Sequence, residues 1–271
     1  MRLSLLTIAA LACTGASAGW LTHAEAADVS ARELTAALYK ATAAEPLDYS
    51  NKNLSYLDLS GIDFKGARLA HADLFGVDMT GSNLKGVNLV GARLDRTTII
   101  RADFSGANLS GATMLVPAAF LTLGNATHEA PRFTGATLTR FRVNGEYWRV
   151  DFRGADLSDA DFSPHSKRFG DTTISVTRRT AFRSCDFSGA KMIRANLSRV
   201  LVHFSVLAGA DLSGADLREA DFSKADLSGA DLTGANIART NFDGADLRGV
   251  RGFDQAIGAE QAVNLDKAVR Q

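Results

Sequence analysis

Residues 210–229 read ADLSG-ADLRE-ADFSK-ADLSG, a unit of five residues that repeats four times without a slip. A period of five matches neither the 3.6-residue turn of an α-helix nor the two-residue alternation of a flat strand. The chain must therefore change direction after every short extended step. Because the change comes at a fixed interval, the sequence predicts a chain that coils around its own axis.

A large apolar residue occupies every fifth position in two long runs, from Leu54 to Met114 and from Phe182 to Leu247. A small residue, most often alanine, lies two positions before each of these centres, and Asp or Asn usually lies between the two. Residues two apart in an extended step face the same side, so we expect the centre and its small neighbour to point inward. The Asp or Asn then faces water and supports a turn. Glycine, common two positions after the centre, supplies the positive φ that tight turns need.

With this register the chain resembles the pentapeptide-repeat proteins, whose unit is Ala-(Asp/Asn)-Leu-x-x. The resemblance covers roughly residues 52–252. It implies an all-β fold: a right-handed quadrilateral β-helix, or pentapeptide-repeat solenoid, with four pentads in each coil. Such a solenoid has two open ends, which need covers against end-to-end stacking.

Four pentads in each coil place residues twenty apart in columns. One apolar column is expected at Phe162, Phe182, Val202, Phe222 and Phe242, and another at Phe64, Leu84 and Phe104. A charged column is expected outside, at Arg179, Arg199, Glu219 and Arg239. Aromatic rings in one column can pack on one another, and exposed ion pairs in the other are worth about 0 to 1 kcal/mol each.

Two segments flanking the repeats are predicted to cover the ends of the solenoid. In the segment 28–51, Ser30 and Glu33 have the spacing of a helix capping box, and the apolar residues that follow share one helical face. This predicts a short N-terminal capping helix and a linker. The segment 253–271 is predicted to form a C-terminal cap, with apolar contacts from Ala256, Ile257, Val263 and Leu265.

Residues 1–27 have the features of a secretory signal peptide. Arg2 gives a basic start, an apolar run follows at 3–12, and small-x-small cleavage patterns come after it. The run is too short to span a membrane as a helix. We therefore expect export, with the periplasm as the destination and cleavage just before Ala27 or Asp28. Cys13 leaves a lipid-anchored form open, and retention of the segment as an N-terminal helix is a further alternative.

The middle of the repeat region departs from the pattern near residues 115–131, 139–150 and 163–180. The first two segments are expected to be loops or bulged coils, whereas the third is either a loop or one degenerate coil. Aromatic and basic residues gather in the second segment, and Tyr, Trp and Arg are the types enriched at binding hot spots. The sequence therefore predicts a partner-binding site at Arg140, Phe141, Arg142, Tyr147, Trp148 and Arg149.

Charge is uneven along a chain whose net charge is zero, with 30 basic and 30 acidic residues. Residues 140–199 contain twelve Lys or Arg against seven Asp or Glu, whereas residues 207–247 contain three against eight. The sequence thus predicts a basic middle and an acidic C-terminal part. This distribution is compatible with an anionic partner at the middle, and also with a solvated surface and head-to-tail complementarity.

The sequence contains no recognisable catalytic or metal-binding arrangement. The repeat explains nearly all of the aspartates, the histidines lack ligand spacing, and neither a Gly-x-Ser-x-Gly elbow nor a P-loop occurs. Without Cys13, Cys185 is the sole cysteine, at a small inward position, so we expect a buried apolar side chain outside any disulfide. We therefore expect no enzymatic activity, cofactor or metal.

These observations favour an exported structural or protein-interaction module, a rigid scaffold that binds another envelope or periplasmic protein through its basic–aromatic middle. The family resemblance also raises a DNA-mimic regulator of a topoisomerase. The neutral charge and the export signal disfavour that alternative, and the compartment argues against nucleic-acid binding. An enzyme or ligand binder in the irregular region is a third hypothesis. No transmembrane segment is expected in the mature chain, and an end-to-end homodimer is compatible with an incomplete cap.

Overall fold

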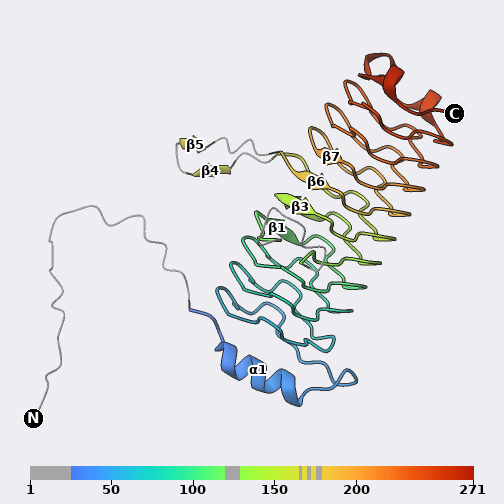
Figure 1. Ribbon diagram of the computed structural model, residues 1–271. Helices are drawn as coiled ribbons and strands as arrows, with labels where there is room; N and C mark the ends of the chain where they lie inside the picture. Colours follow the sequence, from blue (N-terminus) through green and yellow to red (C-terminus); the bar gives the residue numbers. More distant parts are fainter. Residues whose placement is uncertain (1–25, 120–128, 165–166, 170–171, 175–178) are drawn as a thin grey trace, which may run out of the picture.

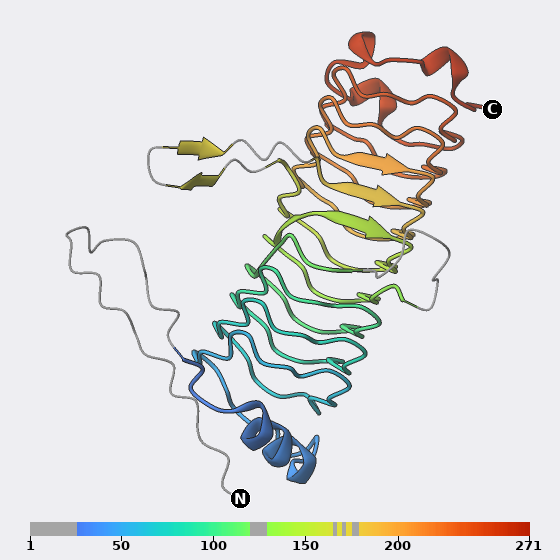
Figure 2. The same cartoon turned by 60° about the vertical axis from the view of Figure 1, so that its left-hand side comes forward.

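The computed structural model describes residues 26–119, 129–164, 167–169, 172–174 and 179–271. Most of the predicted signal peptide lies outside the described residues, as do parts of the first and third irregular segments. The described chain winds into successive coils that stack along one axis into a rod (Figure 1). A view turned by 60° shows the same stack, with helix α1 (Ala31–Lys40) at one end and the C-terminus at the other (Figure 2).

Each regular coil contributes four short extended steps, one to each side of the solenoid. The residues bridged in parallel along one side are Asp48, Arg68, Asn88, Asn108, Thr137, Asp156, Lys191, Asp211, Asp231 and Arg251. Bridges of the same kind run along the other three sides, offset by about five residues. The fold is therefore a four-sided parallel β-helix, as the repeat predicts.

The pentad explains both the extended step and the turn that follows it. In one unit, Asp211 Oδ1 accepts a hydrogen bond from the Ser213 backbone N–H at 3.0 Å. The Ala215 backbone N–H donates to the Leu212 carbonyl at 3.0 Å, which closes the turn. Gly214 lies at φ +64°, the left-handed value that a type II turn requires at its third position. The predicted roles of the Asp and Gly positions are confirmed.

Every apolar centre of the two runs is buried, from Leu54 to Met114 and from Phe182 to Leu247. The alanines two positions before them are buried as well, for example Ala67 and Ala210. Together these side chains form one apolar core that extends through the coils. The predicted inward direction of both positions is confirmed.

Some of the extended steps form regular strands. β1 (Thr113–Leu115) pairs in parallel with β2 (Arg142–Asn144). On the adjoining side, β3 (Glu146–Trp148), β6 (Ala181–Arg183) and β7 (Leu201–His203) form a parallel sheet in the order β3-β6-β7, seen as stacked arrows in Figure 2. β4 (Lys167–Phe169) and β5 (Thr172–Ile174) form an antiparallel hairpin that projects away from the coils (Figure 1).

The irregular middle changes the chain length between stacked residues but not the stacking. Asp103 bridges to Arg132, 29 positions later, so nine residues are added to this coil. Arg132 bridges to Asp151 after 19 positions, because the inward residues Val143 and Tyr147 are four apart instead of five. The second irregular segment is therefore part of a coil that is one residue short. The sequence predicted a loop or a bulged coil there, and the structure shows a shortened step instead.

The third irregular segment is an insertion and not a degenerate coil. Asp151 bridges to Asp186, 35 positions later, so fifteen residues are added, among them the hairpin β4–β5. The Phe162 backbone N–H donates to the Asn196 carbonyl at 2.9 Å. The sequence predicted that Phe162 stacks in the column of Phe182, and this prediction is wrong. The two rings meet edge-on at 5.5 Å from neighbouring sides of the core.

A column of phenylalanines crosses the irregular middle without a break. Phe104, Phe133, Phe152 and Phe187 stack face to face, with successive ring centroids 4.8, 5.1 and 4.8 Å apart. This stack prolongs the column that begins at Phe64, of which the sequence revealed only the regular part. Tyr147 joins another column, where its ring stacks on Phe182 at 5.2 Å.

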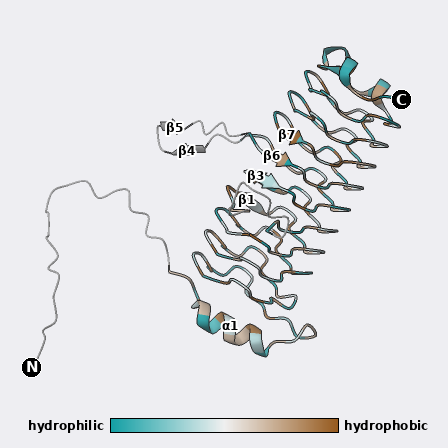
Figure 3. Cartoon of the chain, viewed as in Figure 1, coloured by the Kyte–Doolittle hydropathy of each residue, from teal (hydrophilic) through white to brown (hydrophobic). Residues whose placement is uncertain are grey.

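Helix α1 lies across the N-terminal end of the coils (Figure 1). Ser30 and Glu33 form the expected capping box, in which the Ser30 hydroxyl accepts from the Glu33 N–H at 3.2 Å and the Glu33 carboxylate accepts from the Ser30 N–H at 2.9 Å. Leu34 and Leu38 are buried in the apolar core. The other faces of the helix are exposed, and hydrophilic and hydrophobic colours alternate along it (Figure 3).

The C-terminal segment continues the solenoid with steps of six residues. Its outward bridged residues are Arg251, Ile257, Val263 and Val269, and the steps contain the short 3-10 turns η1 (Phe253–Gln255), η2 (Ala259–Gln261) and η3 (Leu265–Lys267). Ile257 and Val263 are 60% and 44% exposed, so they are not the apolar contacts that the sequence predicted. Ala256 and Leu265 do pack against the core.

Candidate interaction surface

The structure separates the six residues that the sequence predicted as a partner-binding site. Phe141 and Tyr147 are 2% and 1% exposed. Tyr147 is the inward centre of its step, Phe141 occupies the inward position two residues before the centre Val143, and both pack in the apolar core. Neither side chain reaches the surface, which corrects this part of the prediction.

The other four predicted residues lie on different sides of the solenoid. Arg140 is in the turn before β2, and Arg142 is exposed on β2 itself. Trp148 ends β3, and Arg149 occupies the turn after it. Because β2 and β3 pair with different strands on adjoining sides, Arg140 and Arg142 lie apart from Trp148 and Arg149. That the surface around Trp148 and Arg149 binds a partner stays a prediction.

Trp148 and Arg149 belong instead to a strip that four successive coils build. In the sheet β3-β6-β7, Trp148 is in register with Arg183 and His203. All three point outward, because the preceding residue of each strand is buried. The next position is the turn, which Phe204 and Lys224 occupy in the later coils. We call the strip formed by Trp148, Arg149, Arg183, His203, Phe204 and Lys224 the aromatic–cationic ridge.

Cations lie over both aromatic rings of the ridge. The Arg183 guanidinium is 5.3 Å from the centroid of the Trp148 ring, and Lys224 Nζ is 5.4 Å from the centroid of the Phe204 ring. Both distances fall within the range of cation–π attraction, about 6 Å. Arg183 also lies 3.8 Å from the Glu146 carboxylate. These contacts hold the ring and the charge of each pair in a defined arrangement.

His203 is held by a carboxylate on the next coil. Its Nε2 lies 3.1 Å from Asp221 Oδ2. Burial opposes the ionisation of Asp221, but hydrogen bonds from Ser223 and the nearby His203 outweigh it and lower the pKa of this carboxyl. The Asp221 carboxylate therefore lies beside the imidazole at the centre of the ridge.

Phe204 is the most exposed aromatic residue of the ridge. Its side chain is 58% exposed, and its backbone lies at φ +55°. A bulky residue in the left-handed region is strained, and the same turn position is glycine in many pentads. The Phe204 ring is therefore open to contact at the surface of the ridge.

The sequence did not reveal four members of the ridge: Arg183, His203, Phe204 and Lys224. They occupy the two variable positions of otherwise regular pentads, where any polar residue is ordinary. Their one signal was a phenylalanine at a turn position that favours glycine. Their proximity to Trp148 was hidden, because Trp148 and Arg183 are 35 positions apart in the sequence although the two pair directly.

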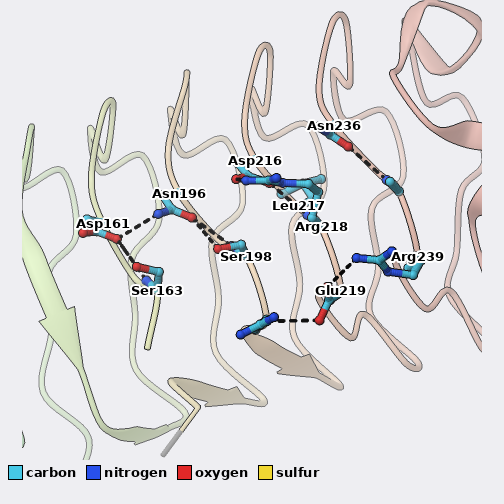
Figure 4. Close-up of polar contacts among 12 residues, drawn as sticks. Asp161, Ser163, Asn196, Ser198, Asp216, Leu217, Arg218, Glu219, Asn236 and Arg239 are labelled. Atoms are coloured by element: carbon cyan, nitrogen blue, oxygen red, sulfur yellow. Dashed lines mark hydrogen bonds and ion pairs between the residues drawn. The ribbon is translucent and has the colours of Figure 1, made fainter. Parts of the chain in front are cut away.

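A charged column lies on a different corner of the solenoid. Glu219 accepts from Arg199 Nε at 3.0 Å and from Arg239 Nη2 at 2.5 Å, one coil to each side (Figure 4). These contacts confirm three members of the column that the sequence predicted. Arg179 does not belong to it, since it lies in the inserted segment before β6. Both arginines of the column pair with the Glu219 carboxylate, which makes the column a weaker candidate for binding than the ridge.

Asp103 joins the two coils that flank the first insertion. Its Oδ2 accepts from Arg132 Nε at 3.1 Å and from Arg132 Nη2 at 2.7 Å, and Lys85 Nζ lies 3.4 Å away. Burial opposes ionisation of this carboxyl, but hydrogen bonds from Ser105 and Arg132 outweigh it and bring the pKa of Asp103 to about 2. The two coils that flank the first insertion are therefore joined by the Asp103–Arg132 ion pair in addition to their backbone bridge.

The described residues show little that resembles a reactive centre. Burial raises the pKa of the Cys185 thiol to about 12, so this group is not a ready nucleophile. Within the described ranges, no three His, Cys, Asp or Glu side chains gather in a way that suits a metal ion. The same part of the chain has no helix of the length and apolarity needed to cross a membrane.

Comparison with known families agrees with the repeat. The family described as Pentapeptide repeats matches the chain in 8 copies, over residues 51–81, 78–114, 195–234 and 210–249. These ranges coincide with the parts of the solenoid in which bridged residues are twenty apart. The chain is a pentapeptide-repeat protein.

Solved structures of other pentapeptide-repeat proteins are similar to this one. HetL, involved in heterocyst differentiation regulation in the cyanobacterium Nostoc sp. Strain PCC 7120, is 25% identical over 84% of this chain and 90% of its own, with a TM-score of 0.34. QnrB1, a plasmid-mediated fluoroquinolone resistance protein, is 19% identical over 76% of this chain and 84% of its own, with a TM-score of 0.30. A protein of the Arabidopsis thaliana thylakoid lumen is 31% identical over 35% of this chain and 63% of its own, with a TM-score of 0.25. No curated protein sequence significantly matches this pentapeptide-repeat protein.

Proposed function

We propose that this pentapeptide-repeat protein is an exported, non-enzymatic scaffold that binds another protein of the envelope or periplasm through its irregular middle. Proteins of this family are often protein-interaction modules. The aromatic–cationic ridge is the observation that carries the proposal. It gathers Trp, Phe and Arg side chains where the irregular middle joins the second run of regular coils, and Trp and Arg are enriched at interaction hot spots.

The core beneath the ridge supports a scaffolding role. Tyr147, Phe182 and Val202 form the inward layer of the sheet that carries the ridge, and all three are buried. The stack from Phe104 to Phe187 ties this region to the coils on both sides. A surface held by a packed core loses less conformational entropy on binding than a flexible one.

Export is the part of the proposal that rests on residues 1–27. Their basic start, short apolar run and small-x-small patterns support secretion. Cell fractionation and the intact mass of the purified native protein test it. We expect a periplasmic chain that begins at Ala27 or Asp28, or a lipid-modified one that begins at Cys13. A cytoplasmic chain that keeps Met1 contradicts export.

The two ends of the proposed right-handed solenoid differ in how well they are covered. Helix α1 buries Leu34 and Leu38 at the N-terminal end, which supports its role as a cap. The last coil exposes Ile257, Val263 and Val269. We propose that an end-to-end homodimer, if one forms, uses this C-terminal end. Sedimentation of the full chain at rising concentration is the test: a dimer should dissociate in Val263→Asp and persist in Tyr39→Asp, a change on the exposed face of α1.

Two alternative functions have less support. A DNA mimic requires a strongly acidic surface, whereas this chain has equal numbers of acidic and basic residues. A ligand pocket in the irregular middle would have used the Tyr147 ring as a wall, but this ring is buried in the core.

Cross-linked pull-down of the tagged full-length protein from fractionated cells of its native host tests the scaffold. The ridge variant carries Arg149→Glu and Lys224→Glu. The matched control carries Lys52→Glu and Arg96→Glu, the same charge change at exposed positions elsewhere. We expect an envelope protein that the parent and the control recover and the ridge variant loses. Recovery of a cytoplasmic topoisomerase, or equal recovery by all three proteins, contradicts the proposal.

A further inference from the structure

The ridge runs along the axis of the solenoid and not around it. Trp148, Arg183 and His203 are direct neighbours on three successive coils, and the Phe204 backbone N–H donates to the Ser223 carbonyl of the fourth at 3.2 Å. Neighbouring coils are spaced like parallel strands, about 4.8 Å apart, so the ridge is roughly 14 Å long. An extended peptide advances about 3.3 Å per residue and needs about five residues to follow it.

The basic side chains of the ridge differ in whether a carboxylate lies beside them. Arg183 faces Glu146 at 3.8 Å and His203 faces Asp221 at 3.1 Å, both on the same side of the solenoid as the ridge. Arg149 and Lys224, at its two ends, have no carboxylate within ion-pair distance among the described residues. The unbalanced charge thus lies at the two ends of the strip, and Arg183, His203 and the exposed Phe204 ring lie between them.

The aromatic rings of the ridge are better placed to contact an apolar side chain of a partner than to stack on a nucleic-acid base. Arg183 lies over the Trp148 ring and Lys224 over the Phe204 ring, so a cation already covers one face of each. Nucleic-acid bases bind to aromatic platforms by stacking on open ring faces. A carboxylate, in contrast, gains from the cation while a neighbouring apolar side chain contacts the ring beside it.

Phe204 adds evidence that the ridge serves a partner. Its exposed fraction is 58% and its φ is +55°. On the same corner of the solenoid the turn is Gly81 and then Arg101 before the ridge, and Gly244 after it, all with positive φ. Glycine therefore satisfies this turn in other coils, and the strained phenylalanine falls within the cationic strip.

We infer that the aromatic–cationic ridge binds an extended acidic segment of a protein partner, aligned with the solenoid axis. Carboxylates of the segment pair with Arg149 and Lys224, and an apolar side chain between them packs on Phe204. The inference rests on the proposed scaffold function and specifies the partner chemistry. It predicts binding that weakens as salt screens the charges.

Fluorescence anisotropy with defined peptides tests the inference on the full chain. The probe is a labelled ten-residue peptide, Glu-Leu-Glu-Glu-Leu repeated twice, and its controls carry Gln or Lys in place of Glu. We expect the acidic peptide to bind at least about tenfold more tightly than either control. Phe204→Gly and Lys224→Glu should each weaken it by about fivefold or more.

The chain offers a matched control for Phe204. Tyr56 is 63% exposed at φ +60°, on a different corner of the solenoid. Tyr56→Gly removes an aromatic ring from the same kind of turn and should change peptide affinity by less than about twofold. Glycine tolerates positive φ, so both glycine variants should fold, and circular dichroism verifies this.

Three results would overturn the inference. They are equal binding of the Gln or Lys peptide, equal weakening by Tyr56→Gly, and tighter binding of a labelled poly-dT oligonucleotide than of the acidic peptide. If the peptide fails while the pull-down still loses its envelope partner in the ridge variant, the scaffold function stands and only the acidic-segment chemistry is wrong. If the peptide binds but no envelope partner is captured, the scaffold function fails instead.

Discussion

The regular coils and the irregular middle of this solenoid share the same stacking of core side chains but differ in the length of chain between stacked residues. In the regular coils, stacked residues are twenty positions apart, whereas in the middle they are 29, 19 or 35 apart. The phenylalanine stack from Phe104 to Phe187 nevertheless crosses the middle without a gap. The core requires each inward side chain to lie on the one below, and the length of chain between steps matters less, because loop closure costs grow slowly with length.

On the outer surface, the residues at equivalent turn positions differ from coil to coil. On the corner that carries the ridge, the turn is glycine at Gly81 and Gly244, whereas Arg101, Arg149, Ser184, Phe204 and Lys224 occupy it in coils between them. Outward turn positions are free of core packing, so their residues can vary without altering the coil. Specialised chemistry therefore collects on the corners while the interior stays uniform.

The largest expected effect comes from a charge placed inside a regular coil. Leu84 is fully buried, and Leu84→Asp should lower the free energy of unfolding by about 4 kcal/mol or more, because an unpaired carboxylate enters the core. Urea unfolding measures it, with Lys52→Asp at an exposed turn as the control. If Leu84→Asp unfolds like the parent, the inward assignment of the regular register is wrong.

A large truncation in the middle tests whether its core is as tightly packed. Phe152 stacks between Phe133 and Phe187, so Phe152→Ala should cost about 3 to 5 kcal/mol. Phe222→Ala in the regular coils is the matched variant and should cost a similar amount. A cost below about 1 kcal/mol for Phe152→Ala alone would show that the middle is loosely packed.

A smaller, pH-dependent effect is expected where the first insertion joins the coils. The pKa of Asp103 is about 2 in the folded chain, below the ordinary 3.8 of an aspartate. Its stabilisation is therefore complete above the ordinary pKa and is lost as the pH falls from 3.8 towards 2. Because Arg132 is solvent-exposed and screened, Asp103→Asn should cost about 1 kcal/mol at pH 7. Unfolding curves from pH 7 to pH 2 should converge for parent and variant, and a constant difference would contradict this account.

A change of opposite sign is expected at Tyr147. Its hydroxyl is buried and has no hydrogen-bond partner among the described residues. Tyr147→Phe removes the unsatisfied group and keeps the ring stacked on Phe182, so it should stabilise the chain by about 1 kcal/mol. Thermal unfolding checks this, and Tyr56→Phe at an exposed turn should leave the melting temperature unchanged. Destabilisation by Tyr147→Phe would show that the hydroxyl has a partner.

The smallest effect is expected in the charged column outside the regular coils. Glu219 accepts from both Arg199 and Arg239, yet the pairs are exposed and screened by solvent. Glu219→Gln should therefore leave the melting temperature nearly unchanged, and any difference should vanish at high salt. A large loss would mean that surface charge, and not the core, holds the regular coils together.

The sequence by itself determined which residues of this protein face the core and which face solvent. The five-residue register assigned every centre from Leu54 to Met114 and from Phe182 to Leu247 to the core, because alternation in a short extended step leaves no other arrangement. The capping box of α1 was equally local, since Ser30 and Glu33 are three residues apart. Local geometry fixed these features, and the structure confirms them.

Only the tertiary structure decided which coils lie together across the irregular middle. The twenty-residue spacing of Phe162 and Phe182 predicted the wrong column, because chain length does not show whether a segment forms a coil or leaves it. Hydrogen bonding settled the register when Asp151 paired with Asp186. The same pairing brought Trp148 beside Arg183. The ridge is therefore a product of stacking between distant segments, which no local pattern in the sequence encodes.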